Sequence, residues 1–85
     1  MAHFVKVEDD GTISEGIVVN NSDCGNLEFP ESEIVGQQFI ASVGINGVWK
    51  QTSYNAKFRK MYAIIGGTYD AVLDEFVAPV NLLAE

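Results

Sequence analysis

Two short runs of alternating apolar and polar residues, separated by a turn signal, constrain the fold of this chain most strongly. Residues 3–8 (HFVKVE) form the first run and residues 12–20 (TISEGIVVN) form the second. Between them, Asp10-Gly11 supplies the positive φ angle that a tight β-hairpin needs. We therefore predict an antiparallel hairpin, and we expect Lys6 and Glu15 to lie near each other across it.

The alternation also assigns side chains to the faces of the two strands. Successive side chains on a strand point to opposite faces, so Val5 and Val7 are expected on one face of the first strand. By the same rule, Ile13, Ile17 and Val19 are expected together on one face of the second strand. The hairpin should therefore present an apolar face to the rest of the chain.

A helix is predicted over residues 31–43, after a loop rich in turn-forming residues. Pro30 suits a helix start, and acidic residues suit the first turn that follows. Apolar residues then recur at the spacing of one helical face: Ile34, Val35, Phe39, Ile40 and Val43. Gly44 is expected to end the helix. A competing interpretation of residues 31–47 places a hairpin at Asn46-Gly47, which lies between apolar flanks.

The second half of the chain contains further strand patterns. Residues 48–54 (VWKQTSY) are rich in β-forming residues, and residues 59–65 (RKMYAII) alternate in polarity. Residues 68–80 (TYDAVLDEFVAPV) are predicted to form a hairpin that turns at residues 70–74, and residues 81–85 a tail. A chain with about five or six short strands and one helix is mainly β, and must close into a small barrel or pack as a sandwich.

The length of the chain, 85 residues, predicts a single domain over residues 1–85. A domain this small is marginally stable alone, so association with further copies of itself is expected. Cys24 is the only cysteine, which excludes a disulfide within the chain. No apolar run approaches the ~18 residues of a membrane span, so we expect a soluble protein that is not secreted by the usual route.

The sequence offers little to an enzyme. His3 is the only histidine, and any serine–histidine or cysteine–histidine pair would have to use it. The acidic pairs Asp9-Asp10 and Asp74-Glu75 fall at predicted turns, where aspartate is expected anyway. We therefore predict no catalytic residue, no metal site and no cofactor.

The distribution of charge points to a binding surface. The chain has a formal net charge of -7, yet residues 34–69 contain four basic residues and no acidic one. Lysine and arginine neutralise phosphates, and the aromatic residues among them, Tyr54, Phe58 and Tyr62, can stack on unpaired bases. The competing interpretation is that Trp49 and Met61 are core and that the lysines are solvated charges on edge strands, which discourage aggregation.

Six residues of this stretch are the candidate nucleic-acid site. The four basic ones would neutralise phosphates, Tyr54 would stack on a base, and Asn55 would make a polar contact. The six residues are Lys50, Tyr54, Asn55, Lys57, Arg59 and Lys60.

Four motifs together resemble a known family. They are "VGQQFIAS" (residues 35–42), "WKQTSYN" (49–55), "FRKMYA" (58–63) and "TYDAVLDEF" (68–76). With the sequence around them, residues 29–80, they resemble small Sm-like (LSm-like) proteins of cyanophage origin, which are abundant in marine metagenomes. The resemblance implies a strongly bent antiparallel β-barrel. The helix that the start signals and periodicity predict near 31–43 would be inserted into it, whereas in the family the helix usually comes first. The resemblance also implies a closed homo-oligomeric ring of roughly five to seven subunits.

Two functions are compatible with this resemblance. The first is a ring that binds RNA or single-stranded DNA, with a role in nucleic-acid processing. The second is a virion structural or assembly protein without affinity for nucleic acid, in which the basic stretch meets an acidic face of a neighbouring subunit. The expected location is the host cytoplasm during infection, or the virion.

Overall fold

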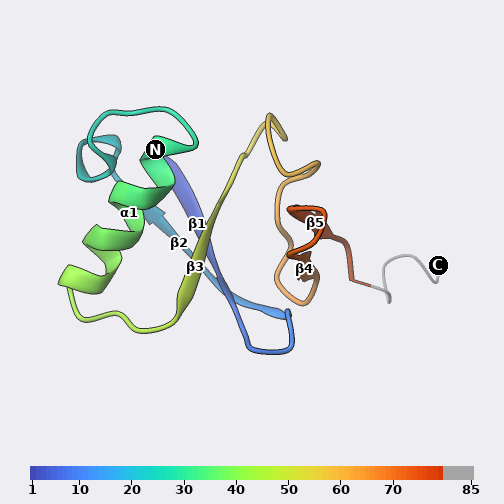
Figure 1. The fold of residues 1–85 in the computed structure, drawn as a ribbon. Helices are drawn as coiled ribbons and strands as arrows, with labels where there is room; N and C mark the ends of the chain where they lie inside the picture. Colours follow the sequence, from blue (N-terminus) through green and yellow to red (C-terminus); the bar gives the residue numbers. More distant parts are fainter. Residues whose placement is uncertain (80–85) are drawn as a thin grey trace.

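The predicted N-terminal hairpin is present. In the computed structural model of this chain, which describes residues 1–79, strand β1 (Ala2–Val7) pairs antiparallel with strand β2 (Ile13–Val19) (Figure 1). The turn between them contains Gly11 at φ 89°, and the carboxylate of Asp10 accepts the Thr12 N–H at 2.9 Å. Lys6 and Glu15 are register partners, and the lysine Nζ lies 3.5 Å from a glutamate oxygen, as expected.

A β-bulge changes the faces that alternation assigns to β2. The register shifts at the end of β1, and Ser14 has no partner in the ladder. Such an extra residue reverses the facing of the residues beyond it. Ile13 therefore packs with Val5, whereas Ile17 and Val19 pack on the opposite side of the sheet. The prediction that Ile13, Ile17 and Val19 share one face is wrong for this reason.

The helix interpretation of the middle segment is confirmed. After a short 3-10 helix η1 (Asn21–Cys24), helix α1 (Glu31–Ser42) begins directly after Pro30. Gly44 follows the helix at φ 85°, a conformation that glycine adopts readily. Asn46-Gly47 lies in the link between α1 and β3, so the competing hairpin does not form.

The buried side of α1 is not the predicted apolar stripe. Ile40 is buried, but Ile34 and Val43 are exposed. In their place, two polar residues, Ser32 and Glu33, are buried on the helix together with Gly36. The stripe was too wide to lie wholly against the sheet, and polar contacts occupy part of the helix surface that the pattern assigned to core.

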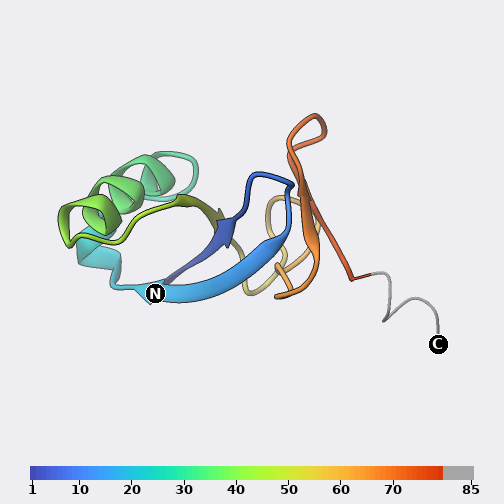
Figure 2. The same ribbon diagram turned by 90° about the horizontal axis from the view of Figure 1, so that it is seen from below.

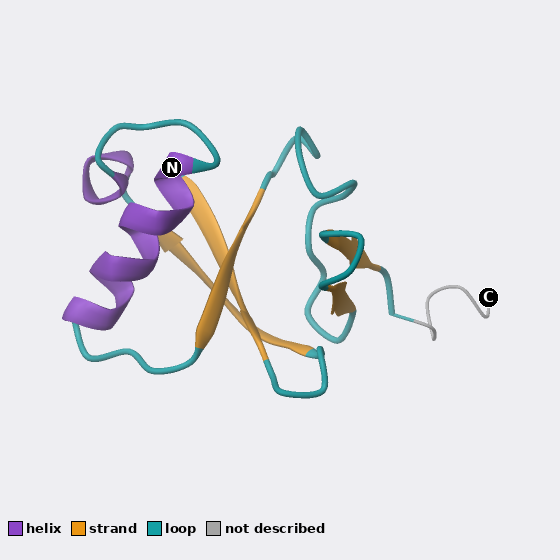
Figure 3. Ribbon diagram, in the orientation of Figure 1, coloured by secondary structure: helices purple, strands orange, loops and turns teal. Residues whose placement is uncertain are grey.

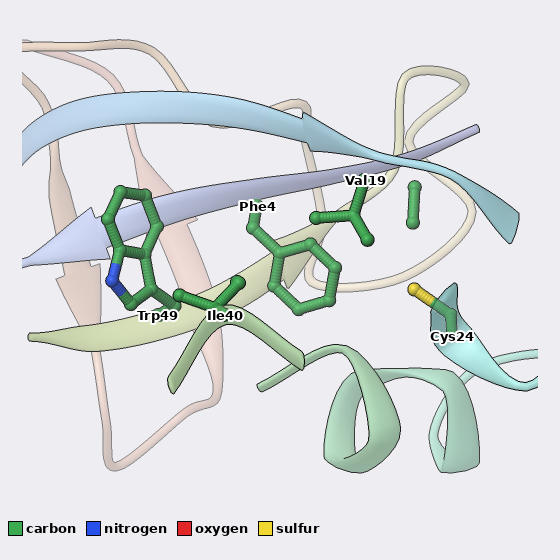
Figure 4. Packing of buried hydrophobic residues seen from close by; sticks show 6 residues of the cluster. Phe4, Val19, Cys24, Ile40 and Trp49 are labelled. Carbon is green, nitrogen blue, oxygen red and sulfur yellow. The ribbon is translucent and has the colours of Figure 1, made fainter. Parts of the chain in front are cut away.

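Strand β3 (Val48–Thr52) completes a sheet in which the strand order is β2-β1-β3 (Figure 3). Helix α1 lies over one face of this sheet, as the two views in Figures 1 and 2 show. The core on that side consists of Ala2, Phe4, Val19, Cys24, Ile40 and Trp49 (Figure 4). Trp49 is therefore a core residue, and its indole N–H donates to the Asn46 carbonyl at 3.1 Å.

The C-terminal hairpin is also present. Strands β4 (Thr68–Asp70) and β5 (Glu75–Val77) form a separate antiparallel pair. A second core lies between this hairpin and the face of the sheet opposite to α1, and it consists of Val5, Ile13, Ala63 and Phe76. A single bridge, Thr12 to Thr68, links the two sheets along their edges. The predicted tail, residues 81–85, lies outside the described residues.

The predicted strand at residues 59–65 does not form. This segment is irregular, and Arg59 and Lys60 have φ angles of 57° and 73°, which an L-residue does not adopt in a strand. Arg59 is turned inward to side chains of two distant segments, and the Ala63 N–H donates to the hydroxyl of Thr52 at 2.9 Å. Long-range contacts therefore replace the ladder that the alternating sequence suggested.

The fold is mainly β, with antiparallel pairing and one α-helix, as predicted at that level. Within residues 1–79 the strands form two sheets, and they do not close into a barrel. No helix among the described residues is long and apolar enough to cross a lipid bilayer.

Candidate nucleic-acid interface

The loop that follows β3 carries most of the predicted site. It runs over residues 53–62 and begins with a tight turn, in which the N–H groups of Ala56 and Lys57 both donate to Ser53 at 3.0 Å. The turn leaves Tyr54, Asn55 and Lys57, which are close together in the sequence, exposed to solvent. These three predicted residues therefore remain together on one solvent-facing segment, which we call the β3 loop.

Tyr54 belongs to an exposed aromatic cluster. Its ring stacks on His3 with a centroid distance of 5.9 Å, and Tyr62 contacts both rings edge-on, at 5.8 Å from His3 and 5.5 Å from Tyr54. The exposed fraction of Tyr54 is 71%. Aromatic rings exposed in this way are the platform on which unpaired bases stack.

His3 belongs to this cluster, although the sequence around it does not predict that. His3 is the register partner of Thr52, so the pairing of β1 with β3 brings it beside the loop that begins one residue later. The two segments are almost fifty residues apart in the chain, and no local pattern joins them. Tyr62, which the sequence predicts can stack, also lies outside the six candidate residues.

An apolar groove begins beside the aromatic cluster. It has a volume of about 510 Å³ and lies between the two N-terminal strands and the irregular segment after the β3 loop. We call it the apolar groove. Its lining consists of His3, Phe4, Val5, Gly16, Ile17, Val18, Thr52, Tyr62, Ala63, Ile64 and Ile65.

A larger and more polar hollow lies beside the middle of the β3 loop, at Lys57 and Phe58. It has a volume of about 740 Å³, and Lys57 and Phe58 line it from the loop. Amide side chains of Asn21, Asn26 and Gln51 contribute to the same hollow. We call it the polar hollow. Amides and a lysine are groups that hydrogen-bond to bases, sugars and phosphates.

Phe58 does not belong to the exposed aromatic cluster. It stacks face to face on Phe29 with a centroid distance of 3.8 Å, and the guanidinium of Arg59 lies 5.0 Å from the Phe29 ring. Both phenylalanines are partly buried. This stack fixes the middle of the β3 loop against the segment that precedes α1.

Arg59 is not offered to a ligand. Its side chain is only 6% exposed, and it forms ion pairs with Glu33 of α1 and Asp74 of the C-terminal hairpin. Its Nε donates to Asp74 Oδ1 at 2.7 Å, and its Nη1 donates to the Gln51 carbonyl at 2.9 Å. Although burial by itself lowers the pKa of Arg59, the hydrogen bonds to Glu33 and Asp74 raise it, so the group stays charged. The structure therefore removes Arg59 from the predicted phosphate contacts.

Tyr69 completes the Arg59 cluster. Its hydroxyl donates to Oδ1 of Asp74, and this hydrogen bond, with the nearby Arg59, holds the pKa of Asp74 below its ordinary value. Burial, followed by the hydrogen bond to the carboxylate, raises the pKa of Tyr69 to about 12. We call Glu33, Arg59, Tyr69 and Asp74 the Arg59 cluster.

The remaining lysines of the candidate site lie apart from the aromatic cluster. The Nζ of Lys50 lies 5.6 Å from the centre of the Tyr69 ring, on the side of the C-terminal hairpin. Lys60 is largely exposed, and its Nζ lies 4.0 Å from a carboxylate oxygen of Glu75. Of the six candidates, the structure thus groups Tyr54, Asn55 and Lys57, separates Lys50 and Lys60 from them, and buries Arg59.

The described residues offer no group of three histidine, cysteine or acidic side chains arranged to hold a metal ion. Cys24 is buried in the core under α1, where burial raises the pKa of its thiol. Comparisons with protein-family models, with curated proteins and with solved structures found no match to this chain.

Proposed function

We propose that this chain is the subunit of a homo-oligomeric Sm-like ring that binds single-stranded nucleic acid, RNA or DNA, on its β3 loop. The observation that carries the proposal is the exposed cluster of His3, Tyr54 and Tyr62. Each base that stacks on an aromatic ring contributes roughly 1–3 kcal/mol, irrespective of its identity. The cluster would bind the bases, and Asn55 and Lys57 would contact the sugar and phosphate beside them.

The two hollows support a path for the strand. The apolar groove meets the aromatic cluster at His3 and Tyr62, and the polar hollow meets the β3 loop at Lys57. A strand that stacks on Tyr54 would therefore continue past Lys57 toward the amides of the polar hollow. Since Arg59 is internal, the phosphate contacts would be few, and the stacking contribution would dominate the affinity.

The finer fold assignment, a strongly bent barrel, is part of this proposal. Two contacts support it. The Thr12–Thr68 bridge continues the strand order from β2 to β4, and at the other side the Phe76 N–H of β5 donates to the Arg59 carbonyl at 3.2 Å. The first contact joins the β2 side of one sheet to β4, and the second joins β5 to the segment that follows β3. The C-terminal hairpin thus contacts the chain on both sides of the sheet β2-β1-β3, which is compatible with a bent barrel. A closed ring of subunits and a phage origin rest on the sequence resemblance alone.

A second candidate function is a virion structural or assembly protein without affinity for nucleic acid. The observation that favours it is the internal use of the basic residues. Arg59 is paired within the chain, Lys60 lies near Glu75, and Lys50 lies against Tyr69. With an overall charge of -7, the remaining positive surface is small, and long-range attraction to nucleic acid would be weak.

Fluorescence anisotropy with labelled single-stranded RNA and DNA, measured at several salt concentrations, separates the two functions. The binding function predicts saturable binding with a shallow salt dependence, a log–log slope of about -0.7 for each phosphate contacted. Tyr54→Ala should weaken binding about tenfold, which corresponds to roughly 1.4 kcal/mol for one lost stack. Lys57→Ala should reduce the slope by about one phosphate contact.

Lys6→Ala is the matched control, because Lys6 is paired with acidic residues of the N-terminal hairpin and lies outside the proposed path. It should leave both affinity and slope unchanged. Absence of binding at low salt would reject the binding function and leave the structural one. An equal loss of affinity in Lys57→Ala and Lys6→Ala would reject the β3 loop as the site.

A further inference from the structure

The turn of the C-terminal hairpin exposes two aliphatic side chains. Between β4 and β5, Val72 is 93% exposed and Leu73 is 64% exposed. Turns of this kind are ordinarily built from glycine, proline, asparagine, aspartate and serine. Figure 2 shows this turn, between β4 and β5, projecting beyond the rest of the ribbon. We call Val72 and Leu73 the apolar tip.

The apolar tip is held in a defined conformation. Oδ1 of Asp70 accepts the N–H groups of Val72 and Leu73 at 2.9 and 3.1 Å, and Asp74 is anchored by Arg59. The hairpin is attached to the core through Phe76, not through the tip. Val72 and Leu73 thus remain largely exposed within the described residues, although hydrogen bonds hold the turn that carries them.

The apolar groove is complementary to the tip in character. Val18 of β2 and Ile65 line it, and both are exposed to solvent. Its volume of about 510 Å³ falls within the ~300–1,000 Å³ of pockets that bury small ligands, and it exceeds what two aliphatic side chains need. β2 is also an edge strand of its sheet, and residues 14–19 have no strand partner on their outer side among the described residues.

The charges around the two surfaces are also complementary. Residues 70–75 (DAVLDE) carry three acidic side chains and no basic one. Asp74 is paired internally with Arg59, which leaves Asp70 and Glu75 beside the tip. The β3 loop, residues 53–62, carries two exposed lysines, Lys57 and Lys60, and no acidic residue, and its last residue, Tyr62, lines the apolar groove. Opposite charges placed around a contact favour that contact and suppress others.

We propose that the apolar tip of one copy of this chain inserts into the apolar groove of the next copy. Val72 and Leu73 would pack against Val18 and Ile65, with the acidic side chains beside the tip facing the exposed lysines of the β3 loop. The contact joins two different surfaces, so it is head-to-tail, and repeating it gives a closed ring or an open filament. The inference rests on the proposed homo-oligomer and names its contact, but it does not require nucleic acid.

Sedimentation velocity without nucleic acid tests the contact over a concentration series. The wild-type chain is expected to form oligomers. The double variant Val72→Ser/Leu73→Ser, which changes only the tip, and Ile65→Asp, which changes only the groove, should each sediment as monomers. The matched control is Ile34→Asp, an equally exposed aliphatic residue on α1, which should leave the oligomer intact. Circular dichroism establishes that each variant is folded.

Mixing the two monomeric variants distinguishes a head-to-tail contact from any other. The tip variant keeps its groove and the groove variant keeps its tip, so an equimolar mixture should form heterodimers and nothing larger. A monomeric wild-type chain, an oligomeric tip variant or a mixture that stays monomeric would each overturn the proposal. A wild-type chain that forms the oligomer but does not bind nucleic acid at low salt would reject only the binding function, so the two proposals fail separately.

Discussion

The two faces of the sheet β2-β1-β3 are covered in different ways. On one face, helix α1 packs through Ile40 against Phe4 and Trp49 of the sheet (Figure 4). On the other face, Val5 is covered by an irregular segment and by the short C-terminal hairpin through Phe76. The first core is closed by an element with its own hydrogen bonds, whereas the second depends on contacts between distant segments.

The Arg59 cluster shows what this difference means physically. Arg59 binds Glu33, which lies 26 residues before it, and Asp74, which lies 15 residues after it. These ion pairs connect the helix on one side of the sheet to the hairpin on the other. The segment at residues 59–65 has no regular backbone ladder. The ion pairs of the buried Arg59 side chain hold this segment in place instead.

The largest expected effect is on the helix-covered face. Phe4 is among the most completely buried side chains, and Phe4→Ala should destabilise the chain by about 3–5 kcal/mol through lost burial and the cavity left behind. Urea denaturation measures this loss. Ile34→Ala, at an exposed position of α1, is the control and should change stability by less than about 0.5 kcal/mol. Equal effects would contradict the placement of this core.

Removal of the buried cation should affect the other face. Arg59→Ala leaves Glu33 buried without its partner, so a loss of about 3 kcal/mol is expected. Hydrogen exchange should show the loss of protection first in residues 61–77, and later in β1. The control is Lys60→Ala, since Lys60 is exposed and its pair with Glu75 is long; it should cost at most about 0.5 kcal/mol. Uniform loss of protection over the whole chain would show that the two faces are one cooperative unit.

At Gly36 in α1, replacing glycine with alanine is expected to lower stability, opposite to the usual effect of helix propensity. A Cβ built at Gly36 would lie 2.3 Å from the Phe4 ring and 3.1 Å from the Cys24 Sγ. Gly36→Ala should therefore destabilise the chain by roughly 1–3 kcal/mol, the usual cost of overpacking, although alanine is favoured over glycine in helices by about 1 kcal/mol. Thermal denaturation should show both Gly36→Ala and the exposed control Ala41→Gly to be less stable. A more stable Gly36→Ala chain would mean that α1 is not packed this closely.

The smallest effect concerns the hydrogen bond of Tyr69. Its pKa is raised from 10.0 to about 12 in the folded chain. The unfolded chain therefore releases this proton first, and the contribution to stability is complete below pH 10 and is lost as the pH rises toward 12. Tyr69→Phe should cost about 1 kcal/mol at neutral pH and should flatten the alkaline loss of stability. An alkaline loss of stability that is the same in Tyr69→Phe as in the wild-type chain would contradict this assignment.

Local patterns predicted the regular elements of this chain well. The turn at Asp10-Gly11, the helix after Pro30 and the hairpin around residues 70–74 all form where their turn and start signals lie. In the candidate site, the pattern also found the exposed segment that carries Tyr54 and Lys57. What it missed were the effects of contacts across the chain. A single unpaired residue, Ser14, turned Ile13 to the other face of the sheet.

The sequence by itself determined the short strands, the helix and the location of the exposed aromatic and basic loop, because turn chemistry and periodicity act over a few neighbouring residues. Only the tertiary structure decided that Arg59 is internal and that His3 joins Tyr54. The alternating residues after position 58 are compatible with a strand, but they are equally compatible with the irregular segment that forms. A buried carboxylate, Glu33, needs a cation beside it, and that requirement, not local preference, fixes the course of the chain there.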